Sequence, residues 1–261
     1  MEVHHPHLHG EKKKIREYCL DFLMLFLAVT LGFFAEQIRE NISENSQAKE
    51  LAKSLYQETF SDSINMQKRL SIRQEKERQT NYFRKYVTDS DLVNLSGRFY
   101  PSFFWTCVVS SAIQFIPNDG ILTQLRNSGS LRYFKNIDVQ NAISRMNVAT
   151  LNVRNRNNQE DAFVEDFARP FMQKYYDFDW EDDLTQHGKK SGLQGISESP
   201  TFHGAQMPFI RNVKEFDRSN AEALATHNLL LIRVTVLLDY NPYIEANHQL
   251  LEALRHAYDL N

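Results

Sequence analysis

Four histidines lie close together near the N-terminus: His4, His5, His7 and His9. Neutral imidazole binds transition metals, so this spacing could support a metal site. Pro6 and Gly10 interrupt the segment and disfavour a fixed ligand geometry. We therefore favour a flexible, polar His- and Lys-rich tail over residues 1–17 and retain a metal site as the alternative.

A second candidate is the acidic cluster of residues 177–183, which could attract calcium: Asp177, Asp179, Glu181, Asp182 and Asp183. An EF-hand loop requires glycine at its sixth position and glutamate at its twelfth. Counted from Asp177, these positions hold Asp182 and Gly188, so the motif fails. We interpret the cluster as a solvated acidic loop, with a non-standard cation site as the alternative.

Catalytic motifs are absent from the sequence. No HExxH, GxSxG, GxGxxG or Walker pattern occurs, and the two cysteines, Cys19 and Cys107, form no CxxC pair. We predict no catalytic residue, no cofactor-binding residue and no cofactor. An active site assembled only in space, near His187 and His203 in the glycine-rich loop 187–204, is the remaining enzymatic hypothesis.

Residues 18–35 form an apolar stretch of 18 residues with one charged side chain, Asp21. At 1.5 Å per residue this gives a helix of about 27 Å, close to the hydrocarbon thickness of a bilayer. The stretch has no polar face of the kind that a soluble surface helix needs. We predict a transmembrane helix over 18–37, with Asp21 either at the interface or in contact with another helix.

Flanking charges predict the orientation of this helix. Lys12, Lys13, Lys14 and Arg16 precede it, whereas Arg39 and Lys49 are the nearest cations after it. The positive-inside rule places the tail in the cytoplasm and the long remainder of the chain on the other side of the membrane. A cleaved signal peptide is the main alternative. A cut after Ala35 would leave Phe33 at the −3 position, so we favour an uncleaved anchor.

The remainder of the chain, 38–261, has the pattern of an all-α extracytoplasmic domain. No proline or glycine occurs between residues 38 and 87, and apolar or small residues recur there at steps of three and four. This predicts one long amphipathic helix, or two in series, leaving the membrane. We expect the mixed-sign run 73–78 to form a solvated face.

Further helices complete the predicted bundle. Residues 99–117 predict a buried core helix bounded by prolines, in preference to a second membrane span. Residues 118–136 predict a helical hairpin. Its first helix is capped by Asn118 or Asp119 and ended by Gly129. Further helices are expected from Asn136 or Asp138, over 160–180, over 220–239 and over 243–258, with an interruption at Asn241-Pro242. Residues 177–208 are expected to form a long surface loop.

Three segments resemble one family of proteins: FLMLFLAVTLGFFAEQI behind the His- and Lys-rich tail, PNDGILTQLRNSGSLRYFKN and EANHQLLEALRHAYDL. They look like an uncharacterised bacterial single-pass membrane-protein family with an N-terminal anchor and a helical extracytoplasmic domain. The hairpin is the most specific part, although Tyr133 and Phe134 stand where two aliphatic residues are usual. The resemblance implies a topology and no activity.

These features predict a membrane-anchored structural or interaction protein of the bacterial cell envelope. Its expected partners are the lipid bilayer and either further copies of itself or another envelope protein. The net charge of −3 provides no basic surface for nucleic acid. The alternatives are an extracytoplasmic ligand sensor that acts through a partner, and an enzyme that uses the 187–204 loop.

Overall fold

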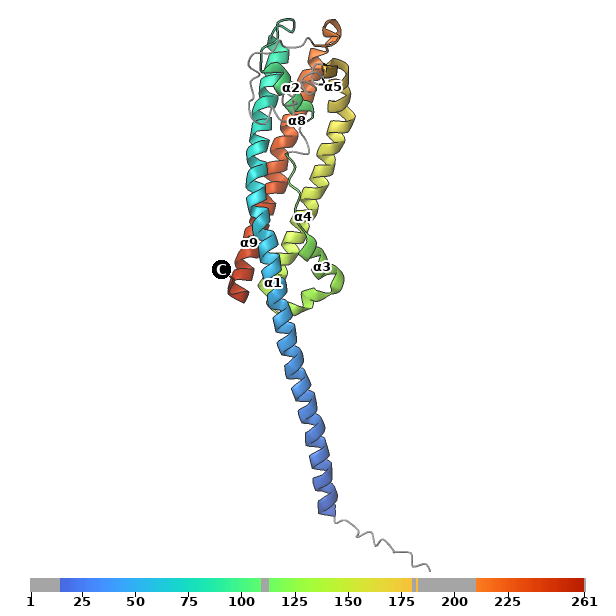
Figure 1. Cartoon of the computed structure of the whole chain (residues 1–261), viewed down its shortest axis with the longest axis vertical. Helices are drawn as coiled ribbons and strands as arrows, with labels where there is room; N and C mark the ends of the chain where they lie inside the picture. Colours follow the sequence, from blue (N-terminus) through green and yellow to red (C-terminus); the bar gives the residue numbers. More distant parts are fainter. Residues whose placement is uncertain (1–14, 109–112, 180–181, 183–209, 261) are drawn as a thin grey trace, which may run out of the picture. The chain divides into compact units, whose positions relative to one another are not determined.

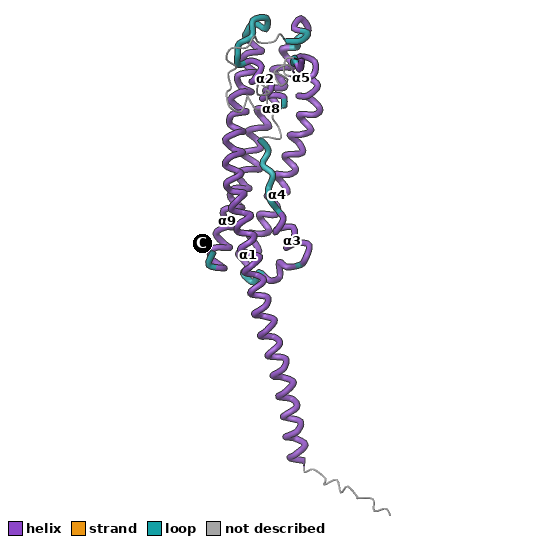
Figure 2. Tube along the Cα trace, in the orientation of Figure 1, coloured by secondary structure: helices purple, strands orange, loops and turns teal. Residues whose placement is uncertain are grey.

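The computed structural model describes residues 15–108, 113–179, 182 and 210–260. Within these ranges the chain forms helices and contains no strand (Figure 2), which confirms the predicted all-α class. The chain divides into two compact units, Met1–Leu51 and Ala52–Asn261.

The described part of the first unit is the N-terminal half of helix α1 (Ile15–Asp89). Every large apolar side chain between Phe22 and Phe34 is exposed, with Phe26 at 55% and Phe33 at 73%. The hydroxyl of Thr30 donates to the carbonyl of Phe26 at 2.7 Å, so this polar side chain is satisfied within the helix. The large apolar side chains of this segment are therefore left exposed.

In the second unit α1 continues without interruption to Asp89, which confirms the long helix predicted after the apolar stretch. Ala52, Leu55 and Met66 lie on its predicted apolar face and are almost fully buried. The absence of proline and glycine over this stretch removes the residues that most often break a helix.

The second unit is a bundle of long helices (Figure 1). Helix α1 from Ala52 and helix α4 (Ile137–Phe163) run beside a continuous rod in which α8 (Arg218–Thr235) and α9 (Asn241–Tyr258) follow each other end to end. Short helices lie at the two ends of this bundle: α2 (Phe99–Cys107) and α5 (Arg169–Tyr175) at one end, and α3 (Gly120–Ser128) with the 3-10 turn η1 (Ser130–Tyr133) at the other.

An aromatic core surrounds α2, whose nine residues are all buried. Phe103 packs against Phe83 of α1 with ring centroids 5.1 Å apart, and against Phe171 of α5 at 5.8 Å. The prediction of a buried core element is confirmed here, but its length was wrong. The helix ends at Cys107, and residues 113–117 are not helical.

Local sequence signals explain several helix ends. Gly129 ends α3 in the left-handed conformation, with φ of 68°. The Asn136 side chain accepts from the backbone N–H groups of Asp138 and Val139 and so caps α4. The predicted cap of α3 was wrong. Asp119 occupies the N-cap position but makes no capping hydrogen bond there.

Two π-helical turns join helices that the sequence pattern separated. Turn η2 (Val164–Ala168) joins α4 to α5, and η4 (Val236–Tyr240) joins α8 to α9. Each turn is followed, two residues later, by a proline, Pro170 or Pro242. Proline lacks the N–H that an α-helix would use, and a wider turn before it accommodates the chain without a break. The predicted interruption at Asn241-Pro242 was wrong: the helix continues through this dipeptide, and the π-helical turn lies just before it.

Candidate functional site

A charged layer lies in the interior of the bundle. The Arg73 guanidinium donates to both carboxylate oxygens of Glu160, at 2.7 and 3.0 Å, and to the Tyr240 hydroxyl at 3.0 Å. Thr235 Oγ1 donates to the same carboxylate at 2.6 Å. Burial opposes the charge of Arg73, but hydrogen bonds and negative charge from Glu160 hold its pKa above the ordinary value. This pair joins α1 and α4 to the α8–α9 connection.

Lys76 lies one turn after Arg73 and is only 2% exposed. Burial lowers the pKa of its amine to about 8, while the charge of Glu160 opposes this shift and that of Arg73 adds to it. Burial also raises the pKa of the nearby Cys107 thiol, which keeps it protonated and a poor nucleophile. The layer therefore has the chemistry of a structural ion cluster.

The sequence pattern predicted a solvated face for residues 73–78, and this was wrong for Arg73 and Lys76. Both continue the buried face of α1 that includes Asp62 and Met66, at helical spacing. The helical spacing of Arg73 and Lys76 on this face could be seen in the sequence, but charged residues are usually exposed, so their burial was not predicted. Glu160, which compensates Arg73, lies 87 residues further along the chain and carries no local signal.

A second polar layer holds the α3 hairpin against α1. The Asp62 carboxylate accepts from the Asn118 backbone at 3.0 Å and from the Tyr243 hydroxyl at 2.7 Å. Glu58 accepts from the Ile121 backbone N–H at 3.2 Å and so provides the cap that Asp119 does not. Burial raises the pKa of both Glu58 and Asp62.

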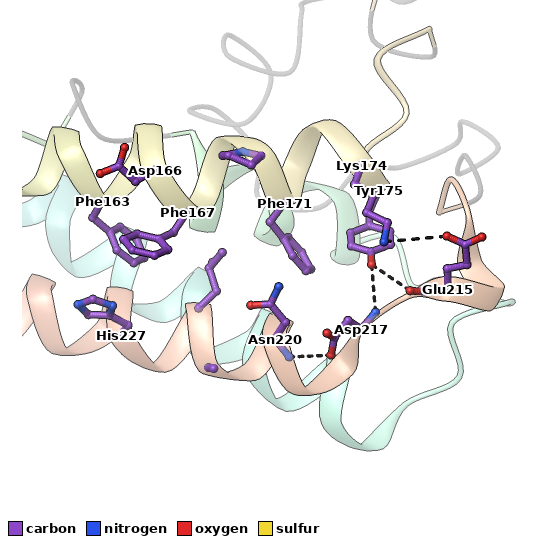
Figure 3. Close-up of a pocket in the computed structure, with 13 residues that line it drawn as sticks. Phe163, Asp166, Phe167, Phe171, Lys174, Tyr175, Glu215, Asp217, Asn220 and His227 are labelled. Atoms are coloured by element: carbon purple, nitrogen blue, oxygen red, sulfur yellow. Dashed lines mark hydrogen bonds and ion pairs between the residues drawn. The ribbon is translucent and has the colours of Figure 1, made fainter.

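An open groove of about 550 Å³ lies between α5 and α8 (Figure 3). One wall is formed by the end of α4, η2 and α5, and the other by α8 and the residues before it. Phe163, Phe167, Phe171 and Tyr175, which the sequence places at steps of four, all line it. The sequence predicted a helix from this spacing and did not predict a groove.

One end of the groove is aromatic. The His227 ring stands edge-on to Phe163 with centroids 4.7 Å apart, and Phe167 lies 6.5 Å from the same ring. Phe163 is buried, whereas Phe167 is 58% exposed on the π-helical turn η2. This end therefore presents aromatic surface to solvent at the mouth of the groove.

The other end of the groove is polar. The Tyr175 hydroxyl donates to the Glu215 carbonyl at 2.9 Å, and the Asp217 backbone N–H donates to this hydroxyl at 3.3 Å. Lys174 lies 4.0 Å from the Glu215 carboxylate. A hydrogen bond and charge from Tyr175 raise the pKa of Lys174, with smaller contributions from Glu215 and Asp217.

Most of the sequence-predicted site residues cannot be placed. His4, His5, His7, His9, His187 and His203 lie outside the described residues, as do Glu181 and Asp183 of the acidic cluster. Among the residues that the structure does describe, no group of three or more His, Cys, Asp or Glu side chains could hold a metal ion. The groove is therefore the candidate site that the structure adds.

A smaller pocket of about 380 Å³ lies beside α2 and η2 and includes Cys107, Met172 and Phe178 in its lining. Its lining also includes Arg169 and Gln173, and burial keeps the Cys107 thiol protonated. No family model, no curated protein and no solved structure matches this chain.

Proposed function

We propose that this protein is a single-pass membrane protein whose N-terminal helix anchors a helical domain. The observation that supports it is the apolar segment of α1. Its 18-residue window has a mean hydropathy of 2.0, and none of that window is buried within the chain. Exposing so many large apolar side chains to water is costly, and lipid would remove this cost.

A second stretch, Arg218–Tyr258, passes the same test of length and hydropathy. It differs because 39% of its window is buried in the bundle. Ile232 and Leu250 pack inside, and Asn247 donates to the Thr59 carbonyl of α1 at 2.8 Å. We therefore assign this stretch to the bundle and only the first to the membrane.

The proposed location is the inner membrane of a bacterium, with the tail in the cytoplasm and residues 38–261 in the periplasm. The excess of Lys and Arg before the apolar segment supports this orientation. The proposed role is structural or in protein interaction, with further copies of the chain or another envelope protein as the partner. Exposed leucines on the bundle, such as Leu230 and Leu237, support a surface for association.

Labelling in spheroplasts tests this topology. We would replace the exposed Val93 by cysteine in a Cys19→Ser background, since the native Cys107 is fully buried and should not react. A membrane-impermeant maleimide should label Val93→Cys in intact spheroplasts. Labelling that appears only after lysis would contradict the periplasmic placement, and release of the chain by carbonate extraction would contradict the anchor.

The second candidate function is ligand sensing through a membrane partner, and the groove between α5 and α8 favours it. Its volume of about 550 Å³ falls in the range of small-molecule sites, and it combines aromatic walls with a few polar groups. The two candidates are compatible, because a ligand in the groove could change the association of the bundle.

A further inference from the structure

The polar end of the groove contains two carboxylates, Glu215 and Asp217, but one ammonium group, Lys174. Lys174 is paired with the Glu215 carboxylate at 4.0 Å and contacts the Tyr175 ring at 5.1 Å. Asp217 accepts one hydrogen bond, from the Asn220 backbone, and forms no ion pair with any residue that the structure describes. The formal charge of Lys174, Glu215 and Asp217 together is therefore negative.

This arrangement disfavours an anionic ligand. A helix N-terminus commonly attracts anions, but at α8 the Asp217 carboxylate already occupies that position as the N-cap. The lysine of the groove lining, Lys174, faces two carboxylates, Glu215 at 4.0 Å and Asp217. An anion entering this end would therefore meet two carboxylates and one ammonium group, a net negative charge.

The rest of the lining suits an apolar body. Phe171 and Leu224 are buried on opposite walls, and Phe167 and His227 present exposed aromatic surface at the far end. Figure 3 shows Phe163, Phe167 and Phe171 directed from one wall toward α8, with Asn220 directed back toward them. Aromatic faces attract cations as well as apolar groups. The third acid of the lining, Asp166, is turned away from α8, so we do not assign it a contact with the ligand.

We propose that the groove binds a small organic cation: a protonated amine carried on an aromatic or branched apolar body. The amine would lie at Asp217 and Asn220, and the body between Phe167, Phe171 and the α8 wall. This inference rests on the second candidate function, ligand binding by the bundle, and does not depend on the membrane anchor.

Three probes that share a phenylethyl body test the charge of the ligand: phenethylammonium, 2-phenylethanol and 3-phenylpropionate. Binding to the full-length protein in detergent micelles would be measured by calorimetry, with empty micelles subtracted. The ammonium probe should bind about fivefold more tightly than the alcohol, which is typical of one partly screened charge pair. The carboxylate should bind more weakly than both.

Two variants test the location. Asp217→Asn keeps a good N-cap but removes the charge, so it should weaken the ammonium probe alone. Phe167→Ala should weaken the ammonium probe and the alcohol alike, since it removes exposed aromatic surface that both use. Leu237→Ala is the matched control, because Leu237 is 64% exposed and lies outside the groove lining.

The possible results distinguish failure of the amine site from failure of ligand sensing as a function. Tighter binding of the carboxylate or the alcohol, lost in Phe167→Ala, would overturn the amine assignment and keep ligand binding. Binding of the ammonium probe that Asp217→Asn does not change would overturn the assigned position of the amine. No saturable binding of any probe would contradict both the amine site and the sensor function, and would leave the anchor unaffected.

Discussion

At the scale of single residues, the buried Lys76 makes a prediction about pH. Its pKa is about 8 in the folded protein and near 10.5 when exposed. Between these values the unfolded chain binds more protons, so the contribution of Lys76 to stability rises with pH from about 8 to about 10.5. Below pH 8 the buried charge costs up to about 3 kcal/mol.

We therefore expect Lys76→Met to be more stable than the natural protein at pH 7, with this advantage shrinking as the pH approaches 10. Thermal unfolding in detergent at several pH values would measure the difference. Lys68→Met is the control, because Lys68 is exposed on the same helix and should change stability by less than about 0.5 kcal/mol. An advantage that is the same at pH 7 and pH 10 would show that the amine is not the cause.

Residue types limited what could be predicted at this scale. The sequence predicted Asn136 as a cap and Gly129 as a helix end because both signals are local. It did not predict that Arg73 is buried, because charge alone argues for solvent and the compensating Glu160 lies on another helix. Glu58 was not predicted to cap α3 because it lies on another helix, α1, far from α3 in the sequence.

At the scale of elements, the turn between α3 and η1 depends on Gly129. Its φ of 68° is unfavourable for a residue with a side chain, although an added Cβ would meet no atom within 4 Å. Gly129→Ala should therefore cost about 1 kcal/mol from backbone strain alone. Gly129→Asn should cost less, because asparagine tolerates this conformation. Chemical denaturation measures both, and equal stability of all three proteins would contradict the assigned strain.

The long apolar periodicities predicted that α1, α4, α8 and α9 exist, but not how they are joined. A π-helical turn adds one residue to a helical repeat, and the sequence signal for it is only a following proline. Proline is an equally good signal for a break. The groove depends on this detail, because η2 carries Phe167 in its wall.

At the scale of the whole molecule, the proposed anchor predicts how the chain partitions between membrane and water. Phe26 lies near the middle of the apolar segment and Phe60 lies on the same helix in the bundle, and the two are 55% and 50% exposed. A lysine near the bilayer centre costs about 3 kcal/mol. Phe26→Lys should shift the protein toward the soluble fraction, whereas Phe60→Lys should not.

Membrane fractionation with quantitative blotting measures this partition. Equal retention of both variants would contradict insertion of the segment in lipid.

Composition and hydropathy were sufficient to predict the apolar helical segment and the all-α class, because both follow from the average properties of long stretches. The groove required the distant segments 163–175 and 215–227 to meet, which no local pattern specifies.

The Arg73–Glu160 pair also constrains the order of events during synthesis. Arg73 leaves the ribosome well before Glu160, and Thr235 and Tyr240 follow about eighty residues after that. Until these partners emerge, the guanidinium must stay hydrated, and the nascent α1 cannot bury this face productively. We expect the bundle to close only late in translation, so that a truncated polypeptide ending before α8, which lacks Thr235 and Tyr240, would expose a charged, half-formed interior to proteases.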